Sequence, residues 1–98
     1  MDIPKILEVI NTYREAFESM GIRPERHPDW LKPGSSKEAA LAHCYYMINQ
    51  MENFVEEKRI EKVFRWLGFV QGILWMTEQY TIDELKNHNR PDKEKKRP

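Results

Sequence analysis

The fold of this chain depends on residues 63–76, which read VFRWLGFVQGILWM. As a helix, this stretch is apolar almost all the way round, although the mean hydropathy of the whole chain is -0.79. It is too short to cross a bilayer. A helix of this kind needs cover on more than one side, and a chain of 98 residues has little other structure to supply it. The stretch therefore indicates assembly or binding rather than chemistry.

The balance of charges narrows the classes of partner. Sixteen Lys and Arg residues offset sixteen Asp and Glu residues, so the chain has no general attraction to nucleic acid or to an anionic membrane. The 40% of hydrophobic residues is enough for one compact core. Cys44 has no partner for an intrachain disulfide, and the start at Met1-Asp2-Ile3-Pro4 does not read as a signal peptide. We therefore expect one cytoplasmic domain that binds neither DNA nor a membrane.

A first helix and a proline-rich connection are predicted in the N-terminal third. An N-cap residue, an early proline and a closing glycine mark out a helix over residues 3–20. Residues 22–34, called the strap below, contain three prolines, which exclude a regular helix there. Within the strap, Trp30 and Leu31 are expected to pin this segment to the core.

Two long helices should follow and form an antiparallel hairpin. Ser35 and Glu38 have the spacing of a capping box and predict a helix over residues 36–57. The next helix is predicted over residues 60–80, after a short turn, because one continuous rod would leave it unsupported. Steps of 100° along the first of these helices place its apolar side chains on one face: Ala40, Cys44, Met47, Ile48, Met51, Phe54 and Val55.

A short last helix and a charged tail complete the predicted architecture. Thr81 and Glu84 have the spacing of a second capping box and open a helix over residues 82–88. Residues 90–98 are almost wholly charged, and we expect them to be a disordered tail. The chain is thus predicted to be all-α, an antiparallel helical hairpin with an N-terminal helix and a short C-terminal helix, in a single domain spanning residues 1–89.

The helix predicted over residues 60–80 carries two apolar strips. The strip assigned to the core holds Ile60, Val63, Phe64, Leu67, Val70 and Leu74. A narrow strip that contains Gly68 and Gly72 separates it from the second apolar strip. Because glycine inside a helix costs about 1 kcal/mol relative to alanine, the presence of two glycines suggests that a neighbour packs closely against them. The second strip is covered either by the strap and the last helix, by another copy of the chain, or by a foreign partner. The predicted interface set is Trp66, Phe69, Ile73, Met76, Tyr80, Gly68 and Gly72.

The chain shows no pattern typical of a catalytic or metal-binding site. Its three histidines lie in different segments, and the neighbours His43 and Cys44 point about 100° apart on a helix, so they cannot share a metal ion. Cys44 lies on the apolar face and is predicted to be a buried, inert thiol. We therefore expect a protein that is not an enzyme and that has no cofactor and no metal site.

Several side chains remain as candidates for binding a small ligand. Gln71 lies within the core strip, where a buried amide must be hydrogen-bonded. Arg65 either pairs with Glu61 on a solvated edge or supplies charge to an anionic or nucleobase-bearing ligand. Tyr45 and Tyr46 are expected on the wetter side of their helix, where amphipathic rings are common at contacts. The candidate ligand-binding set is Arg65, Tyr45, Tyr46, Trp75 and Gln71.

Four segments carry a resemblance to known proteins: HPDWLKP (27–33), KEAALAHC (37–44), RWLGFVQG (65–72) and DELK (83–86). Together they resemble small proteins encoded in tailed-bacteriophage genomes. The hairpin is also similar in layout to helical-hairpin phage proteins that form oligomers and sequester cyclic-nucleotide signals of bacterial immunity. The resemblance implies a homo-oligomeric accessory protein of the host cytosol that counters a host defence function by binding a host protein or a signalling nucleotide. A structural or regulatory helical oligomer without a ligand is the alternative, and a small enzyme is the third possibility.

Overall fold

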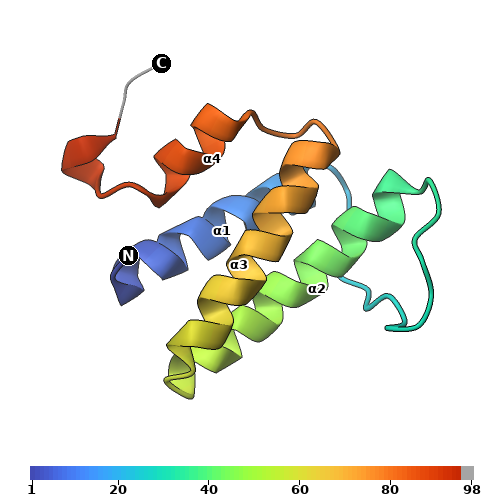
Figure 1. Ribbon diagram of the computed structural model, residues 1–98, viewed down its shortest axis with the longest axis horizontal. Coiled ribbons are helices and arrows are strands. Elements are labelled where there is room, and N and C mark those ends of the chain that lie inside the picture. Colours follow the sequence, from blue (N-terminus) through green and yellow to red (C-terminus); the bar gives the residue numbers. More distant parts are fainter. Residues whose placement is uncertain (96–98) are drawn as a thin grey trace.

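The computed structural model describes residues 1–95, and these form four α-helices and no strand (Figure 1). The helices are α1 (Ile3–Ser19), α2 (Lys37–Glu56), α3 (Ile60–Met76) and α4 (Ile82–Asn89), and a short 3-10 helix follows at Asp92–Glu94. Helix α2 packs between α1 and α3, and α4 lies against α1 and α3. The predicted all-α fold is confirmed. No helix within residues 1–95 is long and apolar enough to span a membrane.

Local sequence determines both ends of α1. The Asp2 carboxylate accepts a hydrogen bond from the backbone N–H of Lys5 at 2.9 Å, and Pro4 occupies the first turn. At the other end Gly21 adopts a φ of 72°, a left-handed conformation that glycine takes without steric cost. The helix ends one residue earlier than predicted.

Ser36 caps α2, so the capping box predicted from Ser35 is wrong. The Ser36 hydroxyl accepts a hydrogen bond from the backbone N–H of Ala39 at 3.1 Å. This register places Ala39, and not Glu38, at the third helical position, and alanine has no side-chain acceptor to complete a box. As a result α2 begins at Lys37, one residue later than predicted.

The turn between α2 and α3 is short, as expected, although it contains no glycine. Lys58 has a φ of 62°, and its N–H donates to the carbonyl of Val55 at 3.0 Å. The N–H of Arg59 donates to the carbonyl of Phe54 at 2.8 Å. These two bonds make a Schellman motif, which ends α2 and sends the chain back along it. The predicted hairpin is confirmed.

We expect the substitution Lys58→Gly to raise the free energy of unfolding by about 0.5–1 kcal/mol, because it removes the Cβ that disfavours left-handed backbone. Urea denaturation monitored by circular dichroism measures the change. Lys58→Ala is the matched control, since it removes the charge and keeps the Cβ. An equal gain for alanine would show that the charge, and not the backbone conformation, limits stability here.

Helix α3 ends at Met76, whereas the apolar pattern predicts a helix that continues to Tyr80. The backbone turns at Glu78, which has a φ of 65°, and the two amides that follow the C-cap bond back to carbonyls of the last turn. The Thr77 hydroxyl also donates to the carbonyl of Ile73 at 2.7 Å. The prediction failed here because glutamate rarely adopts this conformation, and the spacing of apolar residues continues past it.

The predicted capping box at the start of α4 is confirmed. The hydroxyl of Thr81 accepts a hydrogen bond from the N–H of Glu84 at 3.1 Å, and the Glu84 carboxylate accepts one from the N–H of Thr81 at 2.9 Å. These reciprocal bonds hold the pKa of Glu84 below its ordinary value. They give α4, a helix of only eight residues, a fixed beginning.

Part of the tail predicted at residues 90–98 is described by the structure. The 3-10 helix at Asp92–Glu94 lies near the start of α1, where Asp92 and the Lys5 ammonium form an ion pair at 2.7 Å. Hydrogen bonding to Asp92 raises the pKa of Lys5 above its ordinary value. Residues 96–98 of the predicted tail lie outside the described part of the chain.

The core forms where α1, α2 and α3 meet, and Leu85 of α4 closes one side of it. From α3 it takes Val63, Leu67, Val70 and Leu74. The other two residues of the predicted core strip lie outside it, because Phe64 is 40% exposed and Ile60 is only half-buried. The largest fully buried side chains are Tyr13, Phe17, Ile6, Ile10, Ile48, Met51, Leu74, Val9, Val63, Val70 and Cys44.

The strap is not pinned by the residues expected from the sequence. Trp30 is 84% exposed, and Leu31 is exposed as well. Ile22, at the beginning of the strap, packs against the core instead. The backbone N–H of Glu25 donates to the carbonyl of Ala42 at 3.1 Å, so a backbone contact holds the first part of the strap to α2.

Candidate functional site: the outer face of α3

The outward side of α3 is apolar and uncovered. Figure 1 shows α3 in front of α1 and α2, with no other element over its outer side. The exposed fractions of its four large apolar side chains range from 40% to 74%. With two exposed glycines between them, these residues are called the α3 face below: Phe64, Gly68, Phe69, Gly72, Trp75 and Met76.

The glycines at the centre of the α3 face have no packing role within the protomer. A Cβ added at Gly68 or Gly72 would meet no atom within 4 Å, apart from neighbours on the helix itself. Neither glycine has a positive φ, so neither is needed for an unusual backbone conformation. Each of them still costs α3 about 1 kcal/mol relative to alanine. The described part of the chain thus offers no compensation for this cost.

Three residues of the predicted interface set lie off the α3 face. The Trp66 ring meets the Phe54 ring edge to face at a centroid distance of 4.8 Å. Tyr80 packs in the same way on His88, also at 4.8 Å, and Ile73 is half-buried. All three side chains pack against the core. The second strip predicted on α3 is therefore divided between the core and the α3 face.

Tyr45 is buried, so its predicted place on the wetter side of α2 is wrong. Its ring stacks on Phe17 of α1 at a centroid distance of 5.4 Å. Its hydroxyl donates to the Glu18 carboxylate at 3.1 Å, and burial together with this hydrogen bond raises the pKa of Tyr45. Because α2 is held by α1 on one side and by α3 on the other, its buried surface is wider than a single stripe.

The other members of the predicted ligand-binding set are dispersed. Tyr46 lies half-buried under the strap, where the Arg26 guanidinium is 6.0 Å from the centre of its ring. Arg65 lies on the exposed side of α3 toward the turn at Lys58, and within residues 1–95 it forms no ion pair, so the expected pair with Glu61 is not made. Trp75 belongs to the opposite end of α3. The structure does not bring these side chains together with Gln71.

Gln71 is the centre of a hydrogen-bond network that joins three helices. Its Nε2 donates to the Tyr13 hydroxyl and to Oδ1 of Asn89, both at 2.9 Å, and Nδ2 of Asn89 donates back to Oε1 at 3.1 Å. The Tyr13 hydroxyl lies 2.8 Å from Nδ1 of His88, to which it can donate because it already accepts from Gln71. The expectation that this amide is hydrogen-bonded is confirmed. The network is structural and docks α4 onto α1 and α3.

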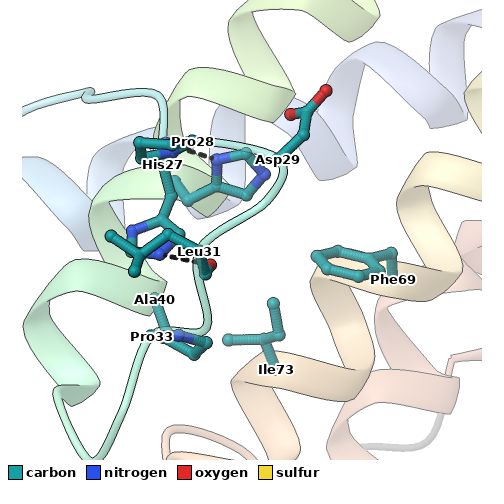
Figure 2. Close-up of a pocket in the computed structure, with 9 residues that line it drawn as sticks. His27, Pro28, Asp29, Leu31, Pro33, Ala40, Phe69 and Ile73 are labelled. Atoms are coloured by element: carbon teal, nitrogen blue, oxygen red, sulfur yellow. Dashed lines mark hydrogen bonds between the residues drawn. The ribbon is translucent and has the colours of Figure 1, made fainter.

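A pocket of about 330 Å³ lies between the strap and α3 (Figure 2). Figure 2 shows Phe69 and Ile73 pointing from α3 toward the strap, whose residues form the opposite wall. The lining residues are His27, Pro28, Asp29, Leu31, Pro33, Ala40, His43, Phe69 and Ile73. The pocket is not apparent from the sequence, because helical periodicity does not determine the path of a proline-rich segment.

Two hydrogen bonds shape the strap beside the pocket. The backbone N–H of His27 donates to Nδ1 of His43 at 3.0 Å, and Nε2 of His27 lies 2.8 Å from the carbonyl of Leu31. The His43 ring also meets the Phe69 ring nearly at right angles, at a centroid distance of 6.3 Å. Burial is the main reason that the pKa of His43 is lowered, and the nearby His27 adds to the effect.

We expect stability to fall as the pH is lowered from about 7 to 5. Burial lowers the pKa values of both His43 and His88 below the ordinary value, so around pH 6 the unfolded chain binds more protons than the folded chain. The folded form consequently loses stability as the pH falls through this range. Urea denaturation at pH 7.5, 6.5 and 5.5 measures the slope.

The control for this prediction is a variant with both His43→Asn and His88→Asn. An asparagine side-chain oxygen can accept the hydrogen bonds now made to the two Nδ1 atoms, but it does not titrate. The variant should therefore have a flatter profile between pH 7 and 5. The same slope in both proteins would contradict the assignment to these histidines.

Two of the possible reactive groups, a metal-binding cluster and the Cys44 thiol, can be judged within the described residues. Within residues 1–95 no group of three or more His, Cys, Asp or Glu side chains lies close enough to hold a metal ion. Cys44 is fully buried, and burial raises the pKa of its thiol to about 12. A thiol with this pKa is not ionised at neutral pH and is a poor nucleophile, as predicted from its place on the apolar face.

Comparison with protein-family models, with curated proteins and with solved structures finds no match to this chain. The site must therefore be interpreted from its own geometry. The α3 face combines exposed apolar side chains with two glycines that have no packing role within a single protomer.

Proposed function

We propose that this protein is a binding protein that acts as a homodimer, with the two copies joined through their α3 faces. The observation that carries the proposal is the pair of exposed glycines between exposed aromatic side chains. A stripe of small residues allows two helix backbones to approach closely, and the flanking side chains then pack on both sides of the contact. The cost of the glycines in each protomer is offset only when a second helix occupies the stripe.

The extent of the α3 face supports a second copy as its occupant. Its exposed fractions correspond to about 400 Å² of apolar surface, since a buried aromatic side chain covers about 150–250 Å². The largest apolar patch on a typical monomer covers about 300–600 Å² and is often a functional surface. Two such faces contribute about 800 Å², and with Arg65, Glu61 and the glycine backbones the total reaches the lower range of stable interfaces, about 1,200 Å².

The order of residues along α3 also suits a two-fold axis. Suppose that two α3 helices pack antiparallel, with Gly68 of one copy opposite Gly72 of the second copy. The two residue numbers of every facing pair then add up to 140, as 68 and 72 do. Phe64 then lies opposite Met76, and a thioether packs favourably against an aromatic ring. Arg65 lies opposite Trp75, an arrangement that favours a cation–π contact. Each copy supplies both members of each pair, which an interface with two-fold symmetry requires.

A homodimer is compatible with the broader function that the resemblance to phage proteins implies. The feature that supports binding as the activity is the exposed apolar surface of the α3 face. We propose that the dimer is the working unit of an accessory protein that counters a host function. The surfaces that remain outside the α3 faces are available to a host partner.

The experiment that tests the dimer compares two tryptophan substitutions. Trp75→Asp places a carboxylate inside the proposed interface, and we expect the dimer dissociation constant to rise at least tenfold, because a charge without a partner is costly to bury. Sedimentation velocity over a range of protein concentrations measures this constant. Trp30→Asp is the matched control, because Trp30 is 84% exposed on the strap. A wild-type chain that sediments as a monomer at about 100 μM, or equal effects of the two substitutions, would contradict the proposal.

A further inference from the structure

The pocket under the strap offers one hydrogen-bond donor that the protein itself does not use. Nδ1 of His43 accepts the N–H of His27, so a neutral His43 carries its hydrogen on Nε2. Within residues 1–95 no acceptor is bonded to this Nε2–H, although His43 lines the pocket. Burial lowers the pKa of His43, which keeps the ring neutral at pH 7 and keeps this assignment of the hydrogen in place.

Asp29 provides an acceptor at the rim of the same pocket. Its carboxylate is oriented by Arg26, whose guanidinium donates to both carboxylate oxygens at 3.2 Å. The lining contains no lysine or arginine, and its one formal charge, on Asp29, is negative. The nearby Arg26 is engaged with Asp29, so a phosphate or carboxylate group in the pocket would find no free cation to balance its charge. A neutral group that accepts from His43 and donates to Asp29 satisfies both polar positions.

The remaining walls are apolar and favour a flat ring. Phe69 and Ile73 from α3 face Leu31 and Pro33 of the strap, as Figure 2 shows. A volume of about 330 Å³ is at the lower end of the range for ligand pockets, so it suits one or two fused rings without a long substituent. The exposed half of the Phe69 ring supplies an aromatic surface on which such a ring can pack.

We infer that this pocket binds an uncharged cyclic amide of one or two rings, whose carbonyl oxygen accepts from Nε2–H of His43 and whose ring N–H donates to Asp29. The site shares Phe69 with the α3 face but does not include Gly68, Gly72 or Trp75, and its polar groups, on His43 and Asp29, lie outside that face. The ligand class includes nucleobase-like heterocycles without a phosphate group.

The probe that tests this inference is 2-quinolinone, a fused-ring cyclic amide, added to the ¹⁵N-labelled full chain and followed by ¹H–¹⁵N correlation spectra. We expect saturable shifts at strap residues and at Ala40, His43, Phe69 and Ile73, with a dissociation constant below about 1 mM. The N-methyl derivative, which lacks the N–H, should bind at least threefold more weakly. Quinoline-2-carboxylate, an anion of similar size, should bind more weakly still.

Matched variants distinguish this site from non-specific binding. His43→Asn keeps an acceptor for the His27 N–H and removes the Nε2–H donor, so binding of 2-quinolinone should weaken about fivefold. His88→Asn is the control, because His88 is also half-buried but lies outside the pocket, and it should leave the affinity unchanged.

Three results would overturn the inference. The first is the absence of saturable shifts around the pocket at 5 mM 2-quinolinone. The second is an unchanged affinity in His43→Asn when its spectrum shows a folded protein. The third is tighter binding of the quinoline carboxylate than of the neutral amide, because the charge argument would then have the wrong sign.

Discussion

Replacing Gly68 and Gly72 together with alanine is expected to strengthen each protomer and to weaken the dimer. Alanine favours the helix by about 1 kcal/mol at each position, and both added methyl groups have open space in a single protomer. In the proposed dimer the same methyl groups lie where the two helices approach most closely. Overpacking a tight contact costs about 1–3 kcal/mol, so we expect the dimer dissociation constant to rise at least a hundredfold.

Two measurements separate these opposite effects. Urea denaturation at a concentration where the protein is monomeric reports the gain in protomer stability, and sedimentation equilibrium reports the dimer constant. Gly21→Ala is the control, because Gly21 has a φ of 72° and lies outside the α3 face, so it should lose stability and leave the dimer constant unchanged. If the double alanine variant were more stable and dimerised as well as the wild type, the glycines would have no role at an interface.

Removing the side chain of Tyr13 is expected to cost about 4 kcal/mol of folding free energy. The ring is fully buried and packs against Tyr80 at a centroid distance of 5.8 Å, so Tyr13→Ala leaves a large cavity, for which about 3–5 kcal/mol is typical. The hydroxyl is also the link between Gln71 and His88. For a chain of this size the loss corresponds to a fall in melting temperature of roughly 20 °C.

Tyr13→Phe isolates the contribution of the hydroxyl. This variant keeps the ring and leaves Nδ1 of His88 without its donor, so we expect a loss of about 1–2 kcal/mol. Tyr46→Ala is a matched control, because Tyr46 is half-buried outside the network and should lose about 1 kcal/mol. Thermal unfolding by calorimetry measures all three variants. A Tyr13→Phe protein as stable as the wild type would show that the network does not stabilise the docking of α4.

The helices whose ends carry specific signals were predicted most closely. Asp2 and Gly21 mark the two ends of α1, and the reciprocal bonds between Thr81 and Glu84 mark the start of α4. Each of these signals depends on a side chain or a backbone preference that acts within one turn of helix. Such local effects can be read from a single sequence.

The end of α3 could not be predicted, because no local sequence signal marks it. Glu78 adopts the conformation that usually indicates glycine, and tertiary packing of Tyr80 on His88 holds the chain beyond it. The same limitation applies to Ser36, since Ser35 next to it offers an equally good cap and only the register of the folded helix decides between them. These choices depend on contacts between elements, which the sequence does not display.

The candidate site was predicted in part. Gly68, Gly72, Phe69 and Met76 were assigned to an interface from the sequence and lie on the α3 face. Phe64 and Trp75 were not, although steps of 100° place both within about 40° of Gly68, a signal that was available. Trp66 was also assigned to the interface, but in the structure Phe54 covers its ring. The position of Phe54 depends on how α2 packs on α3, which the sequence does not show.

Few interactions hold the strap to the helices, so the pocket beneath it can open quickly. Two backbone amides, those of Glu25 and His27, hold it against α2, while its largest side chain, Trp30, contributes almost no burial. Detaching the strap therefore breaks few interactions and leaves the helices intact, so it belongs to the low-energy local openings that proteins sample far more often than they unfold. The ligand proposed for the pocket would enter beneath the strap through openings of this kind, on the timescale of loop motion.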